Sequence, residues 1–265
     1  SADSRQVYKG LDLGTGKVTE EEMEGVPHHM LDVVEPNQPY SVADFQAGAY
    51  AAIDDILARG RTPFLVGGTG LYVRAVTEGF TFTDARPDPA LRAELEGKTT
   101  EELYALLREK TGVTLTGGEE NNRHRLMRSV EKALSGRWES PPPCPRYDCL
   151  LLGVTFPREE VCRRIDARLQ ARIDAGMLDE VAELRANGAT DAFLEGLGLE
   201  YRYILRYLTG QIPTLDGLKD ELGRAIKRFA KRQMVWFKKD RDVLWLDMEG
   251  DFLAQASRAV EGFLA

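Results

Sequence analysis

The chain has 265 residues, of which 43% are hydrophobic and 29% charged, so it can bury a large core as one domain with an insertion or as two domains. Its formal net charge of −8 at pH 7 argues against nucleic-acid binding over the whole surface, and any such binding would need local basic faces. No apolar stretch reaches membrane-spanning length, no signal peptide is visible, and the three cysteines lack zinc-ligand spacing. We therefore expect a cytoplasmic protein with no membrane anchor and no structural metal.

Residues 1–8 are small and polar at their start, as if a strand had just ended. Asp3, at this expected strand end, could act as a general base. Aspartate also caps helices and forms turns, so a purely structural role for Asp3 stays open. A shared metal at His28 and His29 is not expected, because adjacent side chains on a strand point to opposite faces.

A glycine-rich turn follows the first predicted helix. That helix starts at Ser41, which has capping-box spacing to Asp44, and it ends at Gly60. We interpret residues 64–66 as a buried parallel strand that leads into the Gly-Gly-Thr-Gly turn of residues 67–70 and a second helix. Glycines at such a turn let backbone N–H groups approach a phosphate or a nucleotide, although the pattern is often only a turn.

The pattern changes to helices alone from about residue 81, which predicts a helical insertion. Residues 84–89 and 140–143 have linker-like composition. Apolar residues at helical spacing predict helices over residues 103–107 and 126–134. The second of these helices is basic, and its cations include Arg125 and Arg128.

Residues 149–154 predict a second buried strand, and residues 158–184 a long helix. Arg164, Arg168 and Arg172 lie four apart on that helix and share one face, where a row of guanidinium groups could hold a pyrophosphate. Asp166 and Asp174 could instead pair with these arginines as a solvated face, which is the commoner arrangement.

The clearest amphipathic helix is predicted over residues 219–239. Gln233 falls within its apolar face, where an unpaired amide would cost roughly 1–3 kcal/mol, so we expect a partner or a ligand there. The opposite face fits a phosphate backbone or, alternatively, a solvated basic surface. This basic stripe consists of Arg224, Lys227, Arg228, Lys231 and Lys238.

Five motifs carry a resemblance that covers nearly the whole chain. In order, they are Ser1-Ala2-Asp3-Ser4-Arg5-Gln6-Val7-Tyr8-Lys9-Gly10-Leu11-Asp12, Pro27-His28-His29-Met30-Leu31-Asp32, Tyr40-Ser41-Val42-Ala43-Asp44-Phe45, Val66-Gly67-Gly68-Thr69-Gly70-Leu71-Tyr72 and Lys231-Arg232-Gln233-Met234-Val235-Trp236-Phe237. Each motif alone is modest, but the ordered set resembles the tRNA dimethylallyltransferases, also called tRNA isopentenyltransferases.

The resemblance implies an α/β fold, with a P-loop-kinase-like parallel sheet core flanked by helices and formed by residues 1–80 and 141–265. An all-helical insertion at residues 81–140 would bind the tRNA anticodon stem-loop. The implied reaction transfers the dimethylallyl group of dimethylallyl diphosphate to the exocyclic N6 amine of the adenosine 3′-adjacent to the anticodon. The resemblance further implies Mg²⁺ with the diphosphate, and we expect a monomer.

Roles for individual residues follow from their positions in the matching motifs. Asp3 would take the proton of the amine, Thr69 would lie beside it, and Arg164 and Arg168 would face the diphosphate. The residues implied to contact tRNA are Asp3, Ser4, Arg5, Gln6, Thr69, Arg125, Arg128, Lys227, Lys231, Arg232, Gln233 and Trp236.

The chain departs from the family pattern at His124, where glutamine is commoner, and at Leu199, where tyrosine is commoner. The family's glycine-rich P-loop should precede Ser1, and neither residues 67–70 nor residues 14–17 have its lysine spacing. We therefore expect the chain as given to fold but not to catalyse the transfer.

Two other functions stay open from the sequence. A P-loop-type small-molecule kinase would share the sheet and the arginines but would not need the basic helix or the insertion. A non-catalytic RNA-binding module would keep the basic helix and the insertion but would not need Asp3.

Overall fold

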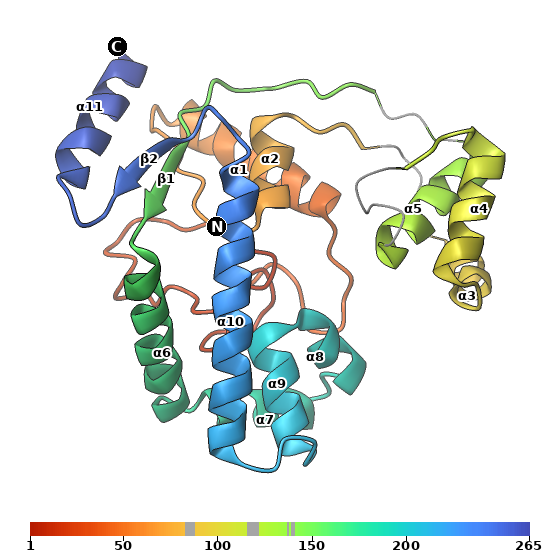
Figure 1. Cartoon of the computed structure of the whole chain (residues 1–265). Helices are drawn as coiled ribbons and strands as arrows, with labels where there is room; N and C mark the ends of the chain where they lie inside the picture. The colour runs from red at the N-terminus through yellow and green to blue at the C-terminus, as the bar shows by residue number, and fades with distance from the viewer. Residues whose placement is uncertain (83–87, 116–121, 137, 139–140) are drawn as a thin grey trace. The chain divides into compact units, whose positions relative to one another are not determined.

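The computed structural model describes residues 1–82, 88–115, 122–136, 138 and 141–265. The chain forms two compact units, one made of Ser1–Thr77 with Arg146–Ala265 and the other of Glu78–Pro145. Among the helices of the described residues, none has the length and apolarity needed to cross a membrane. The first unit (Figure 1) contains α1 (Val42–Ala58), α2 (Gly70–Thr77), β1 (Leu152–Thr155), α6 (Arg158–Asp174), α7 (Met177–Ala186), α8 (Asp191–Leu197), α9 (Leu199–Leu208), α10 (Leu215–Phe237), β2 (Leu244–Asp247) and α11 (Phe252–Leu264).

The sheet in the described residues is a parallel pair of strands, β1 and β2, with Leu152 opposite Leu244. The predicted strand at residues 149–154 is therefore present in part, but it is not buried, since Val154 is 60% exposed. Residues 64–66 form no strand, and Phe64 and Val66 are 74% and 69% exposed. A parallel strand becomes buried only when strands and helices cover both of its faces, and within the described residues these segments lack that cover.

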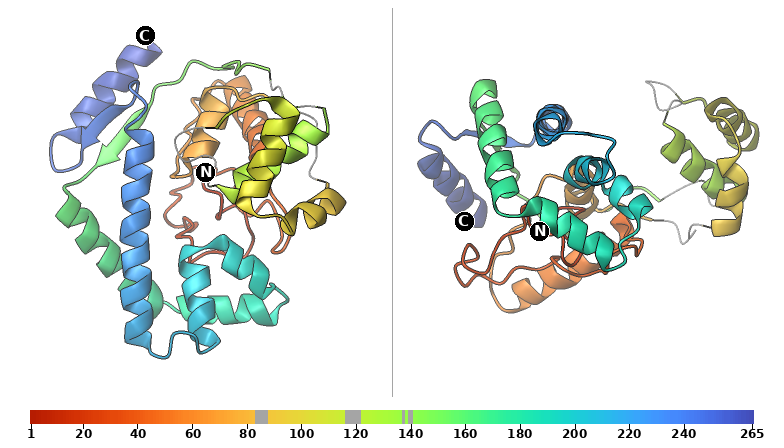
Figure 2. Two further views of the ribbon diagram at one scale, coloured as in Figure 1. Left: turned by 45° about the vertical axis from the view of Figure 1, so that its right-hand side comes forward. Right: turned by 90° about the horizontal axis from the view of Figure 1, so that it is seen from below.

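Helix α10 is the central element of the first unit's core. It packs against both α6 and α9, as Figures 1 and 2 show. Leu218 and Leu222 are fully buried, and Ile226 is 6% exposed. Their i, i+4, i+8 spacing places them on one face. The predicted apolar face is therefore buried at Leu222 and Ile226, whereas Phe229, at the next position of the same apolar pattern, is 36% exposed.

Helix α1 begins as predicted. The Ser41 hydroxyl and the Asp44 carboxylate form the reciprocal capping box. Phe45 of α1 stacks on Tyr72 of α2 with ring centroids 4.0 Å apart. This aromatic contact anchors α2, and with it the glycine-rich turn that α2 follows.

The second unit contains α3 (Pro89–Glu96), α4 (Thr100–Thr111) and α5 (Arg123–Leu134), which confirms helices at the two predicted positions. The Arg123 guanidinium donates to the carbonyls of Leu95, Glu96 and Lys98 at the end of α3. Residues 84–87 and 140 of the predicted linkers and the side chain of His124 lie outside the described residues. The core of this unit consists of Leu95, Leu103, Leu107, Leu126 and Val130.

The long helix predicted over residues 158–184 is instead two helices, α6 and α7. The break falls at Gly176, which has φ 98°. An L residue rarely adopts this left-handed conformation, so glycine permits the turn between the two helices.

The carboxylate of Glu180, near the start of α7, holds the loop that contains Asp12, Leu13 and Gly14. Its oxygens accept the backbone N–H groups of these residues at 3.0, 2.6 and 3.1 Å. The Tyr201 hydroxyl donates to the same carboxylate at 2.9 Å. Four donors thus converge on one anion, which fixes the loop without any strand pairing.

We predict that Glu180→Gln lowers the free energy of unfolding by about 1.5–3 kcal/mol, the range for losing hydrogen bonds to a charged acceptor. The new amide N–H₂ group would face backbone N–H groups that need an acceptor. Urea denaturation measures the change, and Glu183→Gln, at an exposed position on the same helix, is the matched control. Equal midpoints for the two variants would contradict this role.

Arg172 and Glu200 support the same loop from the side of Gly16. A Cβ atom added at Gly16 would collide with the Arg172 guanidinium, so the two are in close contact. The Glu200 side chain is 13% exposed, and its Oε1 lies 4.0 Å from Arg172 Nη1. Burial raises the pKa of the Glu200 carboxyl, and the charges of Arg172 and Arg168 offset this rise only in part.

Glu200 therefore makes the stability of the protein depend on pH. A carboxyl whose pKa is raised by folding favours the folded state at low pH, and this contribution is lost as pH rises above about 4.3, the ordinary glutamate value. We predict that Glu200→Gln becomes progressively more stable relative to the unmodified chain as pH rises from about 4 to 7. Thermal unfolding at several pH values tests this prediction. Parallel stability curves for the two proteins would contradict it.

Candidate active site

Asp3 lies in a tight turn at the start of the chain. Its Oδ1 accepts the backbone N–H groups of Arg5 and Gln6 at 2.7 and 3.3 Å. No hydrogen bond within the described residues reaches Oδ2. The turn-forming role that the sequence left open is thus present at one carboxylate oxygen, while the other oxygen is available for a reacting group.

Thr69 binds the segment that contains Asp3. Its Oγ1 accepts the Ser4 N–H at 3.0 Å, and its backbone N–H donates to the Ala2 carbonyl at 3.2 Å. The Ala2 N–H in turn donates to Val66 at 2.7 Å. The structure therefore brings Thr69 beside Ser4 and Asp3, as the family resemblance implied, although Thr69 is separated from them by more than 60 residues.

The glycines of residues 67–70 allow close contact with other parts of the protein. A Cβ at Gly67 would collide with the Ala2 backbone, and one at Gly68 with the Gln233 amide. A Cβ at Gly70 would collide with the Trp236 indole. The turn is thus enclosed between the segment 2–4 and helix α10, and these contacts by themselves account for three of its glycines.

Gln233 has the partner that its position on the apolar face predicted. Its Nε2 donates to the Gly68 carbonyl at 3.0 Å. Trp236, one turn further along α10, lies beneath the Arg74 guanidinium, which is 5.9 Å from the ring centroid. Both side chains that the sequence assigned to RNA contact therefore also pack within the protein.

Arg5 and Gln6 follow Asp3 directly. The Arg5 guanidinium is partly buried, which lowers the pKa of this group, and Nη2 donates to the Gly196 carbonyl at 3.4 Å. The Gln6 amide donates to Gly16 at 3.1 Å and accepts from the Ser1 hydroxyl at 2.7 Å. Arg5 thus supplies positive charge close to Asp3, whereas Gln6 is engaged with the neighbouring loop.

The arginines that share one face of α6 differ in their contacts. Arg164 Nε donates to Glu160 at 2.7 Å, and its guanidinium lies 4.1 Å from the centre of the Phe156 ring. Hydrogen bonds from Arg163 and Arg164 lower the pKa of Glu160 to about 2. Arg168 is exposed and has no ion pair among the described residues. Of the three arginines in this row, Arg168 is thus the one whose guanidinium binds no carboxylate of the described residues.

The basic stripe of α10 is exposed at Arg224, Arg228, Lys231 and Lys238, and Arg232, which follows Lys231, is exposed as well. Lys227 differs, because its Nζ is bound to Asp166 Oδ2 at 2.7 Å. Asp166 therefore pairs with Lys227 of α10. The sequence had suggested that it could pair with the arginines of its own helix, α6. Among the described residues, Arg228 and Lys231 have no ion pair and can meet phosphates without breaking one.

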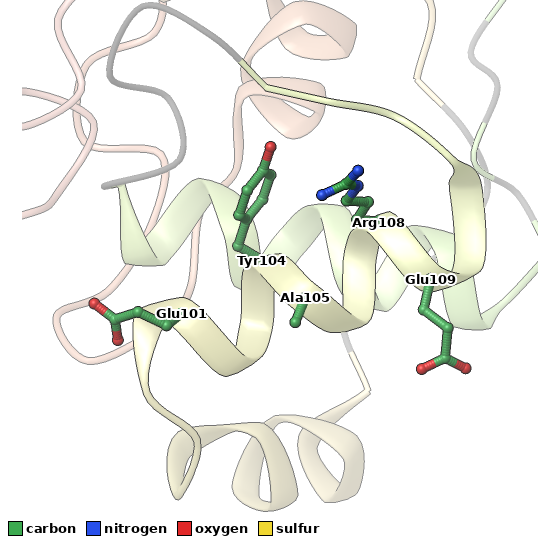
Figure 3. Close-up of a pocket in the computed structure, with 5 residues that line it drawn as sticks. All are labelled: Glu101, Tyr104, Ala105, Arg108 and Glu109. Carbon is green, nitrogen blue, oxygen red and sulfur yellow. The ribbon is translucent and has the colours of Figure 1, made fainter.

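In the second unit, Arg125 is exposed on α5, and Arg128 binds the buried carboxylate of Glu131 at 3.1 Å. A shallow hollow on α4 is lined by Glu101, Tyr104, Ala105, Arg108 and Glu109, with Tyr104 and Arg108 pointing the same way (Figure 3). All five come from one helix and none is a predicted site residue. The hollow therefore carries no part of the candidate site.

Sequence reasoning missed Glu180 and Glu200 as supports of the loop at residues 12–16. Glu180 binds partners 166–168 residues away, a distance in sequence at which no local pattern predicts a contact. Glu200 follows Leu199, whose φ of 38° is unusual for leucine. The departure at Leu199 was visible in the sequence, but its structural consequence was not.

Comparison with known proteins shows the family to which this chain belongs. The family model described as "IPP transferase" matches residues 6–240. The tRNA dimethylallyltransferase of Symbiobacterium thermophilum is 42% identical, over 94% of this chain and 81% of that protein. The enzyme of the same name from Thermobifida fusca is 40% identical, over 98% and 83%.

A solved structure is also similar to this chain over most of its length. The tRNA isopentenylpyrophosphate transferase of Bacillus halodurans superposes with a TM-score of 0.72 at 36% identity, and the match covers 99% of this chain and 85% of that one. Helices around a small parallel sheet are thus shared with a relative of known structure. The chain belongs to the IPP transferase family.

Proposed function

We propose that this protein transfers the dimethylallyl group of dimethylallyl diphosphate to the exocyclic N6 amine of the adenosine 3′-adjacent to the anticodon of tRNAs. Family membership supports the reaction class. The observation that carries the assignment is Asp3, with one carboxylate oxygen fixed by backbone N–H groups and the other available. Neither a small-molecule kinase nor a non-catalytic RNA-binding module would need an available carboxylate oxygen at Asp3.

In the proposed reaction, a bond forms between the amine nitrogen and the allylic carbon, and the bond from that carbon to the diphosphate oxygen breaks. The proton that leaves the amine passes to Asp3 Oδ2, and the electron pair of the broken bond leaves with diphosphate. An aromatic amine is a weak nucleophile, so a base at the amine and an in-line allylic carbon lower the barrier. The side chains of Ser4, Arg5 and Thr69 would lie around the target adenine, beside Asp3.

Recognition of tRNA is assigned to two sets of cations. Arg228, Lys231 and Arg232 on α10 would contact the phosphate backbone, with Lys227 beside them. Arg125 and Arg128 in the second unit would contact the anticodon stem-loop. The target adenine would leave the stack to reach Asp3, which an unpaired anticodon loop makes inexpensive.

The leaving diphosphate is assigned to the α6 side of the site, where Arg168 is exposed and Arg164 would have to leave Glu160. Mg²⁺ bound with the diphosphate is part of the proposal. Within the described residues no three His, Cys, Asp or Glu side chains gather as a metal site requires. Mg²⁺ at such sites is held mainly by substrate phosphates and water with one or two protein oxygens, so the ion would be bound together with the diphosphate. A P-loop-kinase-like core and a monomeric enzyme complete the proposal.

The role of Asp3 is tested by Asp3→Asn, which keeps the Oδ1 acceptor of the turn and removes the basic oxygen. We expect kcat to fall by roughly 10²–10⁴, with little change in tRNA affinity or thermal stability. The assay uses the full-length enzyme, with any residues encoded before Ser1. Asp55→Asn, on the exposed surface of α1, is the control. Activity of Asp3→Asn within a few-fold of the unmodified enzyme would rule out Asp3 as the base.

The basic face of α10 is tested by the salt dependence of binding to an anticodon stem-loop. Arg228→Gln and Lys231→Gln should each reduce the slope of log K against log salt by about 0.7–0.9, because each removes one phosphate contact. Lys227→Gln should have a smaller effect, since Asp166 already neutralises that charge. Lys9→Gln, which removes a charge outside α10, is the control. Unchanged slopes for Arg228→Gln and Lys231→Gln would identify the face as merely solvated.

A further inference from the structure

We infer that Gln233 and Trp236 are positioning residues, which hold the turn at residues 67–70 so that Thr69 keeps Asp3 in place, rather than residues that bind RNA. This inference rests on the proposed function. It changes the role that the sequence motif implied for these two side chains.

The first step is the hydrogen bond from Gln233 to the turn. Gln233 Nε2 donates to the Gly68 carbonyl at 3.0 Å, and its amide fills the space that a side chain at Gly68 would need. An amide that bound RNA would have to release this carbonyl. The lost hydrogen bond would oppose RNA binding, so the geometry favours the internal contact.

The second step is the contact of Trp236 with Gly70. The indole occupies the space beside Gly70 at the start of α2, and Arg74 of α2 lies over its ring. Gln233 and Trp236, three residues apart, therefore grip the carbonyl of Gly68 and the backbone of Gly70, on either side of Thr69. This pair of contacts is here called the α10 clasp.

The third step leads from the clasp to the reacting group. Thr69, between the two clasped glycines, accepts the Ser4 N–H at 3.0 Å and donates to Ala2 at 3.2 Å. Asp3 is the residue between Ala2 and Ser4. A displacement of residues 67–70 would therefore move both peptide groups that flank Asp3.

The clasp and the basic face occupy different sides of α10. At 100° per residue, Gln233 lies about 200° around the helix from Lys231 and about 140° from Arg228. Arg228 and Lys231 are exposed, whereas Gln233 is partly buried against the turn. One helix can thus hold RNA on one side and the Asp3 segment on the other, so the structure separates binding residues from positioning residues.

The test compares Gln233→Leu and the isosteric Gln233→Glu with Lys231→Gln in the full-length enzyme. Both Gln233 variants should lower kcat by roughly 10- to 100-fold, the size expected when positioning is lost, with stem-loop affinity and salt slope unchanged. Lys231→Gln should change affinity and slope, which shows that the binding assay detects the loss of one phosphate contact. Gln211→Leu, at an exposed position after α9, is the matched control. Weakened RNA binding by the Gln233 variants at constant kcat would overturn the inference.

Hydrogen exchange provides a readout that does not depend on activity. The Thr69 amide, which donates to Ala2, should exchange faster in both Gln233 variants, while buried helices such as α10 keep their protection. Gly68→Ala should produce the same effect, and its effect should add little to that of Gln233→Leu because both break one contact. Unchanged Thr69 protection would overturn the inference, as would faster exchange at constant kcat. Absence of transfer by the unmodified enzyme would instead refute the proposed function, and the exchange data would still decide whether the clasp exists.

Discussion

The contact of α10 with the glycine-rich turn is the constraint on which the rest of the site depends. Gly68 receives the Gln233 amide on one side, and Gly67 lies against the Ala2 backbone on the other. A side chain at Gly68 would push the turn away from α10, and one at Gly67 would push it away from Ala2. Because Thr69 is held between these contacts, its hydroxyl and N–H group are fixed in the positions from which they bind Ser4 and Ala2.

Loops, rather than sheet pairing, position much of the first unit. Glu180 gathers three backbone N–H groups and one hydroxyl, and Arg172 contacts Gly16 from the other side. Lys17, in the adjacent Gly-Thr-Gly-Lys sequence, binds Asp12 and Asp32 and is 6% exposed. The lysine is therefore part of an internal ion-pair network, consistent with its lack of P-loop spacing.

Charge in this chain is organised locally. The net charge is −8, yet one side of α10 presents cations, and Arg5 supplies positive charge near Asp3. Pairing decides which cations are available, since Lys227 and Arg164 bind carboxylates, whereas Lys231 and Arg168 have no ion pair among the described residues. The number of basic residues in a stripe is thus a poor measure of how many can bind a phosphate.

The sequence by itself determined the elements whose patterns are local. The capping box at Ser41 and the buried face of α10 follow from spacing within a few turns, and the position of Gln233 on an apolar face already required a partner. The ordered motifs predicted the family, and the expectation that Asp3 and Thr69 lie together came from that resemblance. None of these inferences required knowledge of contacts between distant segments.

Tertiary structure alone decided how those elements are used. Gly68 was identified as the partner of Gln233, 165 residues away, only when the helix was packed on the turn. The exposure of residues 64–66 and of β1 was mispredicted because apolar β formers indicate a strand without showing what covers it. Likewise, whether a lysine or arginine is paired depends on neighbours brought together by folding, as Asp166 is to Lys227. Sequence spacing records contacts along one helix, whereas contacts between helices and loops depend on the packing of the whole unit.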